Sequence, residues 1–344
     1  MECDRGDVGM HETSDISAIL AHARERLLDK ANVVATGVGF KVSQGQRTGT
    51  LSIVCSVLEK LPLAALSTAD VVPPEIDGVP TDVVATGRIR ALAGPSSAAH
   101  TVRLRPAPGG VSLGHHDITA GTLGCLVRRG DRVFLLSNNH VLANSNAGAP
   151  GDAILQPGPI DSGTDPADRI ATLEAFVPIV MAEQPSGCAL ARAAADLANG
   201  VARLVGSNAR MRVVSTTTVE NLVDAAIAAP IDVRDVDVDI LGIGPATGVA
   251  RAGLGEPIVK SGRTTGVTNG TIEQVDVTVD VRYGQQVARF SDQMMAGAVS
   301  AGGDSGSVVL DAQHRVVGLL FAGSESTTVI NRIEHVFAAL DVSL

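Results

Sequence analysis

Residues 301–309 read Ala-Gly-Gly-Asp-Ser-Gly-Ser-Val-Val, which places a serine and an acid among small residues, ahead of a β-branched pair. The glycines allow a sharp turn with positive φ that lifts the Ser305 hydroxyl clear of the backbone. The same turn can aim the backbone N–H groups of Gly303 and Ser305 at one point, as an oxyanion hole requires. A glycine-rich hairpin with an incidental serine would give the same pattern. The run therefore predicts a nucleophile only if the chain also supplies a base and an orienting acid.

The composition predicts a globular protein built from short strands. With 344 residues the chain exceeds the usual size of one domain, so we expect two. Hydrophobic residues make up 45% and charged residues 19%, which favours a packed core over disorder. Aromatic residues make up only 2%, so Val, Ala, Ile and Leu must fill that core, and 37 glycines indicate many turns. The formal net charge of −10, without a long basic run, argues against a nucleic-acid or anionic-membrane surface.

The termini and cysteines bear on the compartment. No apolar stretch approaches the roughly 20 residues of a membrane helix, and the polar, acidic start at residues 1–7 has no signal-peptide core behind it. The cysteines are widely spaced and form no Cys-x-x-Cys pair; they are Cys3, Cys55, Cys125 and Cys188. Isolated cysteines favour reduced thiols over a disulfide framework or a zinc site. We therefore expect a cytoplasmic protein without a membrane, metal or cofactor.

The first part of the chain predicts a small α+β domain. An apolar stripe indicates a helix that runs to about Lys30. The strands expected after it are residues 32–42, 51–58 and 79–89. A stretch of small residues at 93–99 marks a boundary, which assigns 1–95 to an accessory domain and 96–344 to a second one. Residues 1–95 hold no cluster of catalytic residue types, so a packing or assembly role is expected there.

From residue 121 the sequence indicates short strands and turns. Helical propensity returns at about 181–206, where we expect a helical insertion, and at 330–340, where apolar residues have helical spacing. His115-His116-Asp117 has the residue types of a metal site. Because no second ligand group lies at metal-binding spacing, we interpret these three as loop residues.

Two residues supply the chemistry that the serine needs. His140 directly follows a predicted strand and opens a polar loop, a position in which an imidazole can act as a base. Taken alone, it would better be interpreted as a structural histidine bonded to Asn138 or Asn139. Asp224 lies in a run of small apolar residues, where a carboxylate needs a hydrogen-bond partner such as an imidazole N–H. His140, Asp224 and Ser305 follow one another at nearly equal spacing.

Four motifs around these residues resemble the chymotrypsin-like (trypsin-fold) serine proteases. They are Leu136-Ser137-Asn138-Asn139-His140-Val141-Leu142, Val223-Asp224-Ala225-Ala226-Ile227-Ala228, Gly303-Asp304-Ser305-Gly306 and Val317-Gly318-Leu319-Leu320-Phe321-Ala322-Gly323-Ser324. The resemblance covers about residues 121–344 and implies a mainly β protein with two six-stranded antiparallel β-barrels. It also implies a serine endopeptidase that cleaves proteins or peptides through a triad of His140, Asp224 and Ser305. The oxyanion hole would lie at Gly303 and Ser305.

The same resemblance implies a substrate pocket. Its residues would be Val299, Ala322, Gly323, Ser324 and Thr328. An acid in place of Val299 would select Arg or Lys, so we expect a small or apolar side chain at the cleaved position.

The sequence departs from the family at several positions. Val141 stands where secreted members carry a cysteine, which agrees with a reducing compartment. Ser307 and Val308 replace a frequent Gly-Pro pair. Phe321 stands where a serine commonly touches the acid, so the support of Asp224 must differ. No Ile-Val activation site is recognisable, which suggests an enzyme that is not activated as a trypsinogen is.

Residues 37–41 and 79–84 resemble the leader region of bacterial trypsin-like proteins related to the plant narrow-leaf protease group. That resemblance implies an intracellular protein and raises the option of a homo-oligomer. Two other functions stay open. An α/β-hydrolase esterase would need Gly-x-Ser-x-Gly, but residue 307 is a serine, and its histidine would have to be His314 or His335. An intact triad is also compatible with a non-catalytic trypsin-fold protein that binds peptides or scaffolds an assembly.

Overall fold

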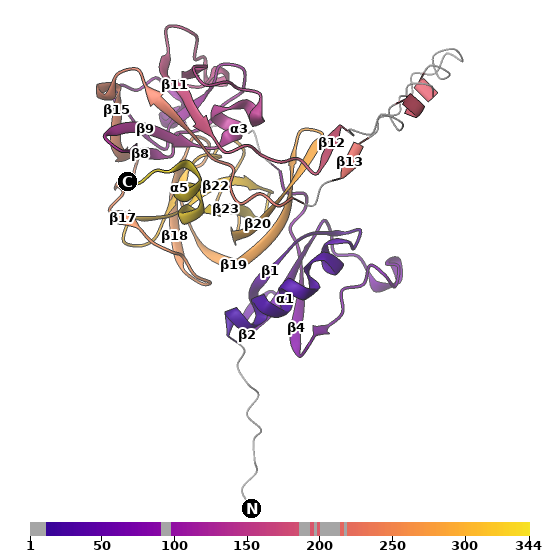
Figure 1. Ribbon diagram of the computed structural model, residues 1–344. Coiled ribbons are helices and arrows are strands. Elements are labelled where there is room, and N and C mark those ends of the chain that lie inside the picture. The colour runs from indigo at the N-terminus through magenta and orange to yellow at the C-terminus, as the bar shows by residue number, and fades with distance from the viewer. Residues whose placement is uncertain (1–11, 91–97, 186–192, 196–197, 200–213, 217–218) are drawn as a thin grey trace, which may run out of the picture.

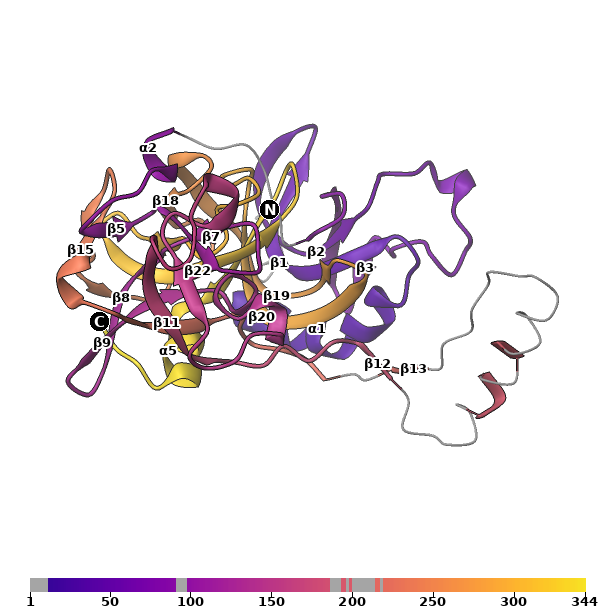
Figure 2. The ribbon, with the colours of Figure 1, turned by 90° about the horizontal axis from the view of Figure 1, so that it is seen from above.

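Strands dominate the computed structural model, which describes residues 12–90, 98–185, 193–195, 198–199, 214–216 and 219–344 (Figure 1). The prediction of a mainly β fold is confirmed. In the view of Figure 1 the first barrel lies at the top, the second barrel in the middle and the N-terminal segment below it. Figure 2 shows the same arrangement from above.

The first barrel is an antiparallel sheet in the order β7-β6-β10-β11-β14-β9-β8. Its strands are β6 (Ser112–His115), β7 (Gly121–Thr122), β8 (Cys125–Arg129), β9 (Arg132–Ser137), β10 (Ala153–Leu155), β11 (Arg169–Phe176) and β14 (Ala226–Pro230). Only residues 123 and 124 separate β7 from β8, so these two short strands act as one and close the sheet as a six-stranded barrel. Aliphatic side chains such as Leu113, Leu135 and Ile154 fill its interior, as the low aromatic content predicts.

The second barrel runs in the order β18-β21-β22-β23-β20-β19, and β19 pairs back with β18. Its strands are β18 (Pro257–Gly262), β19 (Gly266–Tyr283), β20 (Gln286–Ala296), β21 (Val308–Leu310), β22 (Arg315–Gly323) and β23 (Thr328–Arg332). All pairings around this ring are antiparallel. The two six-stranded barrels that the sequence led us to expect are therefore present.

The C-terminal helix α5 (Ile333–Leu340) packs where the two barrels meet. Its Val336 shares a buried cluster with Phe134 of the first barrel and Leu319 of the second. The predicted start of this helix at residue 330 is wrong. Residues 330–332 stay in β23 because they pair with β20 and β22 on either side.

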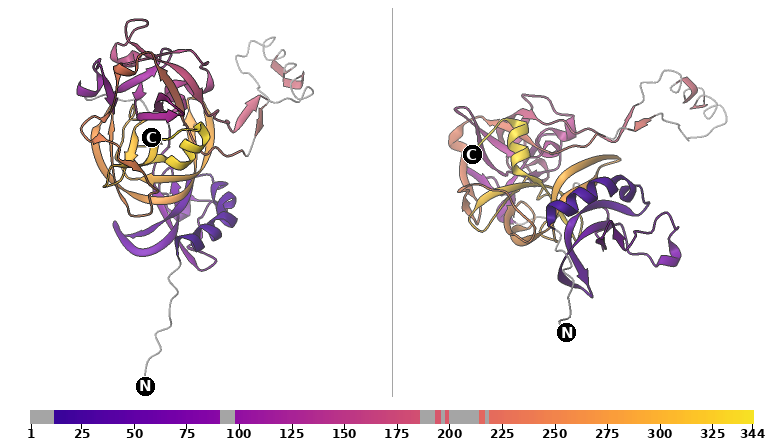
Figure 3. Two further views of the ribbon diagram at one scale, coloured as in Figure 1. Left: turned by 60° about the vertical axis from the view of Figure 1, so that its left-hand side comes forward. Right: turned by 60° about the horizontal axis from the view of Figure 1, so that its bottom comes forward.

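The N-terminal segment extends the sheet of the second barrel. It consists of α1 (Thr13–Leu28), β1 (Val33–Ser43), β2 (Gln46–Val57), β3 (Glu75–Ile76) and β4 (Val79–Ala85). The helix lies on β1 and β2 (Figure 3). Its buried residues belong to the predicted apolar stripe and include Leu20 and Leu27. Strand β1 pairs with β19, and a Cβ atom on Gly39 would lie 2.8 Å from the Glu273 carbonyl oxygen. The sequence analysis did not anticipate this contact between the segment and the barrel.

The remaining elements are short. They are α2 (Ala98–Thr101), α3 (Asn139–Leu142), β5 (Ala107–Gly109), β12 (Glu183–Pro185), β13 (Val214–Thr216), β15 (Val236–Ile240), β16 (Gly244–Pro245), β17 (Gly248–Val249) and single 3-10 turns at 63–65, 144–146, 159–161 and 233–235. Strands β12 and β13 form a hairpin that projects from the barrels in Figure 1. Most of the helical insertion expected at 181–206 lies outside the described residues. Within the described part of the chain, no helix combines the length and apolar character needed to cross a bilayer.

Candidate active site

His140 and Asp224 are joined by two hydrogen bonds. His140 lies in α3, just after β9, and Asp224 lies just before β14. The Nδ1 of His140 is 2.5 Å from Oδ2 of Asp224, and the backbone N–H of His140 donates to Oδ1 at 3.2 Å. An ionised carboxylate only accepts hydrogen bonds, so Nδ1 carries the proton. That tautomer leaves Nε2 of His140 as the basic nitrogen.

The fully buried Asp224 carboxylate has a further partner that the sequence analysis missed. Tyr283, the last residue of β19, donates its hydroxyl to Oδ2 of Asp224 at 2.7 Å. Burial, followed by the adjacent carboxylate, raises the pKa of Tyr283 well above its usual value, so the hydroxyl remains a donor. Its ring also meets the imidazole of His140 edge-on, with 5.9 Å between centroids. The only indication in the sequence was indirect: Phe321 has no hydroxyl, so the acid needed a hydrogen-bond donor from another residue.

The backbone of Asp224 is held in the same way. Its N–H donates to Oδ1 of Asn331 at 3.0 Å, and its carbonyl accepts from Nδ2 of Asn138 at 2.7 Å. Asn331 in turn donates to Oε1 of Gln293 at 2.7 Å. Asn331 and Gln293 belong to β23 and β20, so the second barrel fixes the acid of the first.

Ser305 lies in a tight turn between β20 and β21 and is 4% exposed. The turn needs glycine at two positions, because Gly303 and Gly306 have φ of +97° and +96°. The N–H of Asp304 donates to the Ala301 carbonyl at 3.1 Å. By contrast, the N–H groups of Gly303 and Ser305 donate to no group among the described residues. Two unpaired donors beside a hydroxyl can stabilise an oxyanion.

A buried ion pair holds this turn. The carboxylate of Asp304 accepts from the N–H groups of Thr264 and Thr265 at 2.8 and 3.1 Å, and from the Thr265 hydroxyl at 2.7 Å. Nζ of Lys260 lies 3.2 Å from the same carboxylate and also bonds the Thr265 hydroxyl and the Gly266 carbonyl. Burial lowers the pKa of Lys260, and the negative charge of Asp304 opposes this effect. All the strong partners of Asp304 come from the second barrel.

Ser305 and His140 share no hydrogen bond among the described residues. The Ser305 hydroxyl donates to the Phe321 carbonyl at 3.4 Å. Gly121 separates the turn from α3, since a Cβ atom there would lie 2.4 Å from a Val141 methyl group and 2.9 Å from the Ser305 carbonyl oxygen. Hydrogen bonds between catalytic groups are often long in the absence of substrate.

The predicted pocket residues divide into two sets. Val299 packs in the core of the second barrel, against Gly270. The next residue, Ser300, bonds the Thr328 hydroxyl at 2.8 Å, and its Oγ would lie 3.6 Å from a Cβ atom on Gly323. Ser300 therefore lies with Thr328 and Gly323. Of the two other predicted residues, Ala322 lies in β22 and Ser324 directly follows that strand.

Two further groups of reactive side chains lie among the described residues: His115 with His116 and Asp117, and the thiols of Cys55 and Cys125. The ring nitrogens of His115 are both used within the protein, by Asp152 at 3.0 Å and by the backbone N–H of Asp117 at 3.1 Å. One ligand atom each of His115, His116 and Asp117 lies within 4.8 Å of the others, the spacing of a metal site, but both ring nitrogens of His115 are already bonded within the protein. Burial raises the pKa of both Cys55 and Cys125 to about 12, so these thiols are poor nucleophiles.

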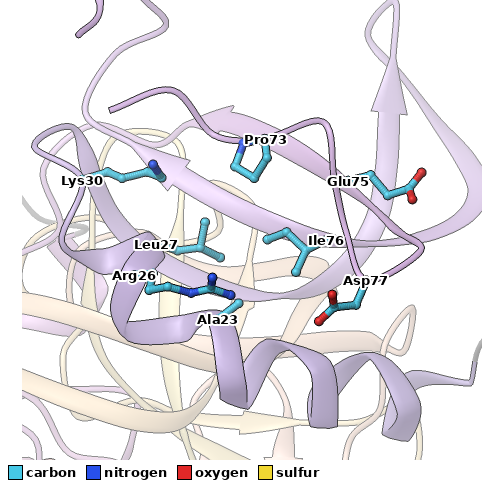
Figure 4. Close-up of a pocket in the computed structure, with 8 residues that line it drawn as sticks. All are labelled: Ala23, Arg26, Leu27, Lys30, Pro73, Glu75, Ile76 and Asp77. Carbon is cyan, nitrogen blue, oxygen red and sulfur yellow. The ribbon is translucent and has the colours of Figure 1, made fainter. Parts of the chain in front are cut away.

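Figure 4 shows a surface hollow in the N-terminal segment, between the end of α1 and β3. Its lining residues are Ala23, Arg26, Leu27, Lys30, Pro73, Glu75, Ile76 and Asp77. No residue of either barrel lines it, and it contains neither a nucleophile nor a neutral base. We assign no chemistry to this hollow.

Comparisons with solved structures give distant similarities. Thermobifida fusca protease A is 16% identical, with 69% of this chain and 98% of that chain covered and a TM-score of 0.44. A glutamic acid specific serine protease is 18% identical, with 69% and 100% covered and a TM-score of 0.43. Cellulomonas bogoriensis chymotrypsin is 14% identical, with 69% and 97% covered and a TM-score of 0.42.

Sequence comparisons find less. No model of a known protein family matches the chain, and a search of curated proteins finds no relative. At such low similarity a function has to be argued from the residues of this chain.

Proposed function

We propose that the chain is a serine endopeptidase in which Ser305 is the nucleophile, His140 the general base and Asp224 the orienting acid. One observation carries the proposal: a fully buried carboxylate lies 2.5 Å from Nδ1 of His140. A buried charge is costly unless hydrogen-bond donors compensate it. Here the carboxylate accepts from Nδ1–H of His140 and so fixes the tautomer that leaves Nε2 as the basic nitrogen. Gly121 lies between α3 and the turn that carries Ser305. In that turn the N–H groups of Gly303 and Ser305 have no acceptor among the described residues.

The mechanism follows from these roles. Oγ of Ser305 bonds to the carbonyl carbon of the substrate while its proton passes to Nε2 of His140. The N–H groups of Gly303 and Ser305 stabilise the oxyanion, an effect of about 3–4 kcal/mol per donor. The C–N bond then breaks and His140 returns the proton to the leaving amine. Water releases the acyl group by the same proton transfers, and Asp224 stabilises the imidazolium each time.

The side chains near Ser305 support a small or apolar residue at the cleaved position. Ser300, Gly323 and Thr328 carry no charge, and Ser300 and Thr328 satisfy each other. Val299 adds no acid to this surface. We include Ala322 and Ser324 in the same substrate-binding region.

The setting of this activity rests on the sequence. We propose a cytoplasmic enzyme of bacterial type, related to the plant narrow-leaf protease group, that acts on proteins or peptides. Residues 1–95 would serve as an accessory domain and 96–344 as the protease domain, with a homo-oligomer as an option. The unpaired buried thiols of Cys55 and Cys125 support a reducing compartment.

One observation favours a second function. The Ser305 hydroxyl bonds the Phe321 carbonyl in place of His140. A trypsin-fold protein that binds peptides without cleaving them would tolerate that arrangement.

A fluorophosphonate probe, which reacts with activated serines, distinguishes these functions. We expect the full-length protein to be labelled and to hydrolyse peptides, and Ser305→Ala to abolish labelling and lower turnover by up to about a millionfold. Ser343→Ala, at an exposed serine near the C-terminus, is the control and should react like the parent. Absence of labelling in the parent protein, with peptide binding retained, would establish the non-catalytic function instead.

A further inference from the structure

One edge of β22 is open beside Ser305. Along its first part β22 pairs with β21, as at Val308↔Leu319, and its opposite edge pairs with β23, as at Gly323↔Thr328. From Phe321 onward no barrel strand pairs with the edge of β22 that faces β21. On this open edge the Phe321 carbonyl accepts from the Ser305 hydroxyl. The strand has an irregular register at Leu320–Ala322, and beyond it Gly323 pairs with Thr328 on the β23 side, which leaves the opposite side of Gly323 on the open edge.

The chain itself occupies the second position on this edge. The backbone N–H of Arg90 donates to the Gly323 carbonyl at 3.0 Å, and the N–H of Gly323 donates to the Arg90 carbonyl at 3.0 Å. The two residues form an antiparallel bridge. On its other side the segment meets the end of β19, where the N–H of Arg282 donates to the Ile89 carbonyl at 3.3 Å.

The segment 86–90 is anchored at both ends. Ile89 is 1% exposed and packs in one cluster with Tyr283 and Phe321. The N–H of Thr86 donates to the Val57 carbonyl at 3.0 Å, and the Ser326 hydroxyl donates to the Thr86 carbonyl at 3.3 Å. A buried side chain and bonds to three different elements make this segment a fixed wall of the site.

A peptide that brings a carbonyl group to Ser305 would bind by adding a strand to this edge. The residue with the attacked carbonyl would pair beside Phe321, and the residue two positions before it would need the groups of Gly323. We propose that segment 86–90 determines how much of the substrate is recognised, because Arg90 occupies the backbone groups of Gly323. The substrate would then pair with β22 through only about two residues before the cleaved bond. This inference rests on the proposed protease function.

The test measures both binding and turnover against peptide length. N-acetylated peptides of one to four alanines, as free acids and as amides of a chromogenic amine, are presented to the full-length protein. We expect affinity and kcat/KM to rise from one residue to two and then to change less than threefold. A gain of tenfold or more with the third residue would overturn the inference, because Gly323 would then be free to pair with substrate.

Two variants at one position isolate the backbone contact. Arg90→Pro removes the N–H that bonds Gly323, and the four-residue peptide should then gain at least tenfold over the two-residue peptide. Arg90→Ala keeps that N–H and loses only the exposed guanidinium, so its length dependence should match the parent. Equal length dependence in Arg90→Pro and the parent would count against the inference. If no peptide binds and the fluorophosphonate probe fails to label Ser305, the proposed function fails together with it.

Discussion

The two halves of the candidate site are held in different ways. The pair of His140 and Asp224 belongs to the first barrel, where Asn138 bonds the Asp224 carbonyl, and two further partners of Asp224, Tyr283 and Asn331, come from the second barrel. The turn around Ser305 is held by its own barrel through the ion pair of Lys260 and Asp304. It is also held by the first barrel, because Thr122 donates its hydroxyl to the Gly303 carbonyl and its N–H to the Ser305 carbonyl, each at 2.8 Å. Both halves therefore depend on how the barrels pack, and the half around Ser305 depends in addition on a local buried charge pair.

The largest effect should come from the acid–base half. Asp224→Asn replaces one acceptor oxygen by a donor, so His140 would turn to the other tautomer and lose its basic Nε2. We expect kcat to fall by about 10⁴-fold with little change in folding. Asp131→Asn, at an exposed acid, is the control, and steady-state kinetics with circular dichroism would measure both. A loss of less than tenfold would contradict the role of Asp224.

In the nucleophile half, the first effect should be on stability. Lys260→Met leaves Asp304 buried without its cation, which costs about 3–5 kcal/mol in similar cases. Urea unfolding would measure the loss, and fluorophosphonate labelling of the folded fraction would report the shape of the turn. The double variant Lys260→Met with Asp304→Asn should recover part of the stability. Additive losses in the two single variants would show that the pair is not coupled.

The smallest effect tests the contact between the barrels. Tyr283→Phe keeps the ring and removes a hydrogen bond to a charged group, worth about 1.5–3 kcal/mol, so kcat/KM should fall about 10- to 100-fold. Without this donor the carboxylate acts on the imidazole alone and favours its protonated form. The acidic limb of the kcat/KM profile should therefore move to higher pH, because His140 must be neutral to act as a base.

Thr278→Val is the matched control for that variant. It removes a buried hydroxyl from the same strand, one that has no hydrogen-bond partner among the described residues. Its pH profile should match that of the parent. An unshifted profile in Tyr283→Phe would reduce Tyr283 to a packing residue.

Local patterns were sufficient for much of the fold. The stripe of α1 was predicted because helical spacing is a local property, and the mainly β architecture follows from the glycine turns and aliphatic strands. The pairing of β1 with β19 was missed because the residues of a strand do not by themselves specify which distant strand it pairs with. The prediction that the last helix starts at residue 330 was wrong because strand pairing in the tertiary structure overrides helical spacing.

For the site, the sequence by itself determined the residue types and their order: a histidine after a strand, an acid in an apolar run and a serine between glycines. It also indicated, through Phe321, that the acid needed a different support. Only the tertiary structure decided that Tyr283 gives this support and that Arg90 lies against Gly323. Both contacts join residues far apart in the chain, and their geometry is set by how the barrels and the N-terminal segment pack. No local propensity encodes that packing.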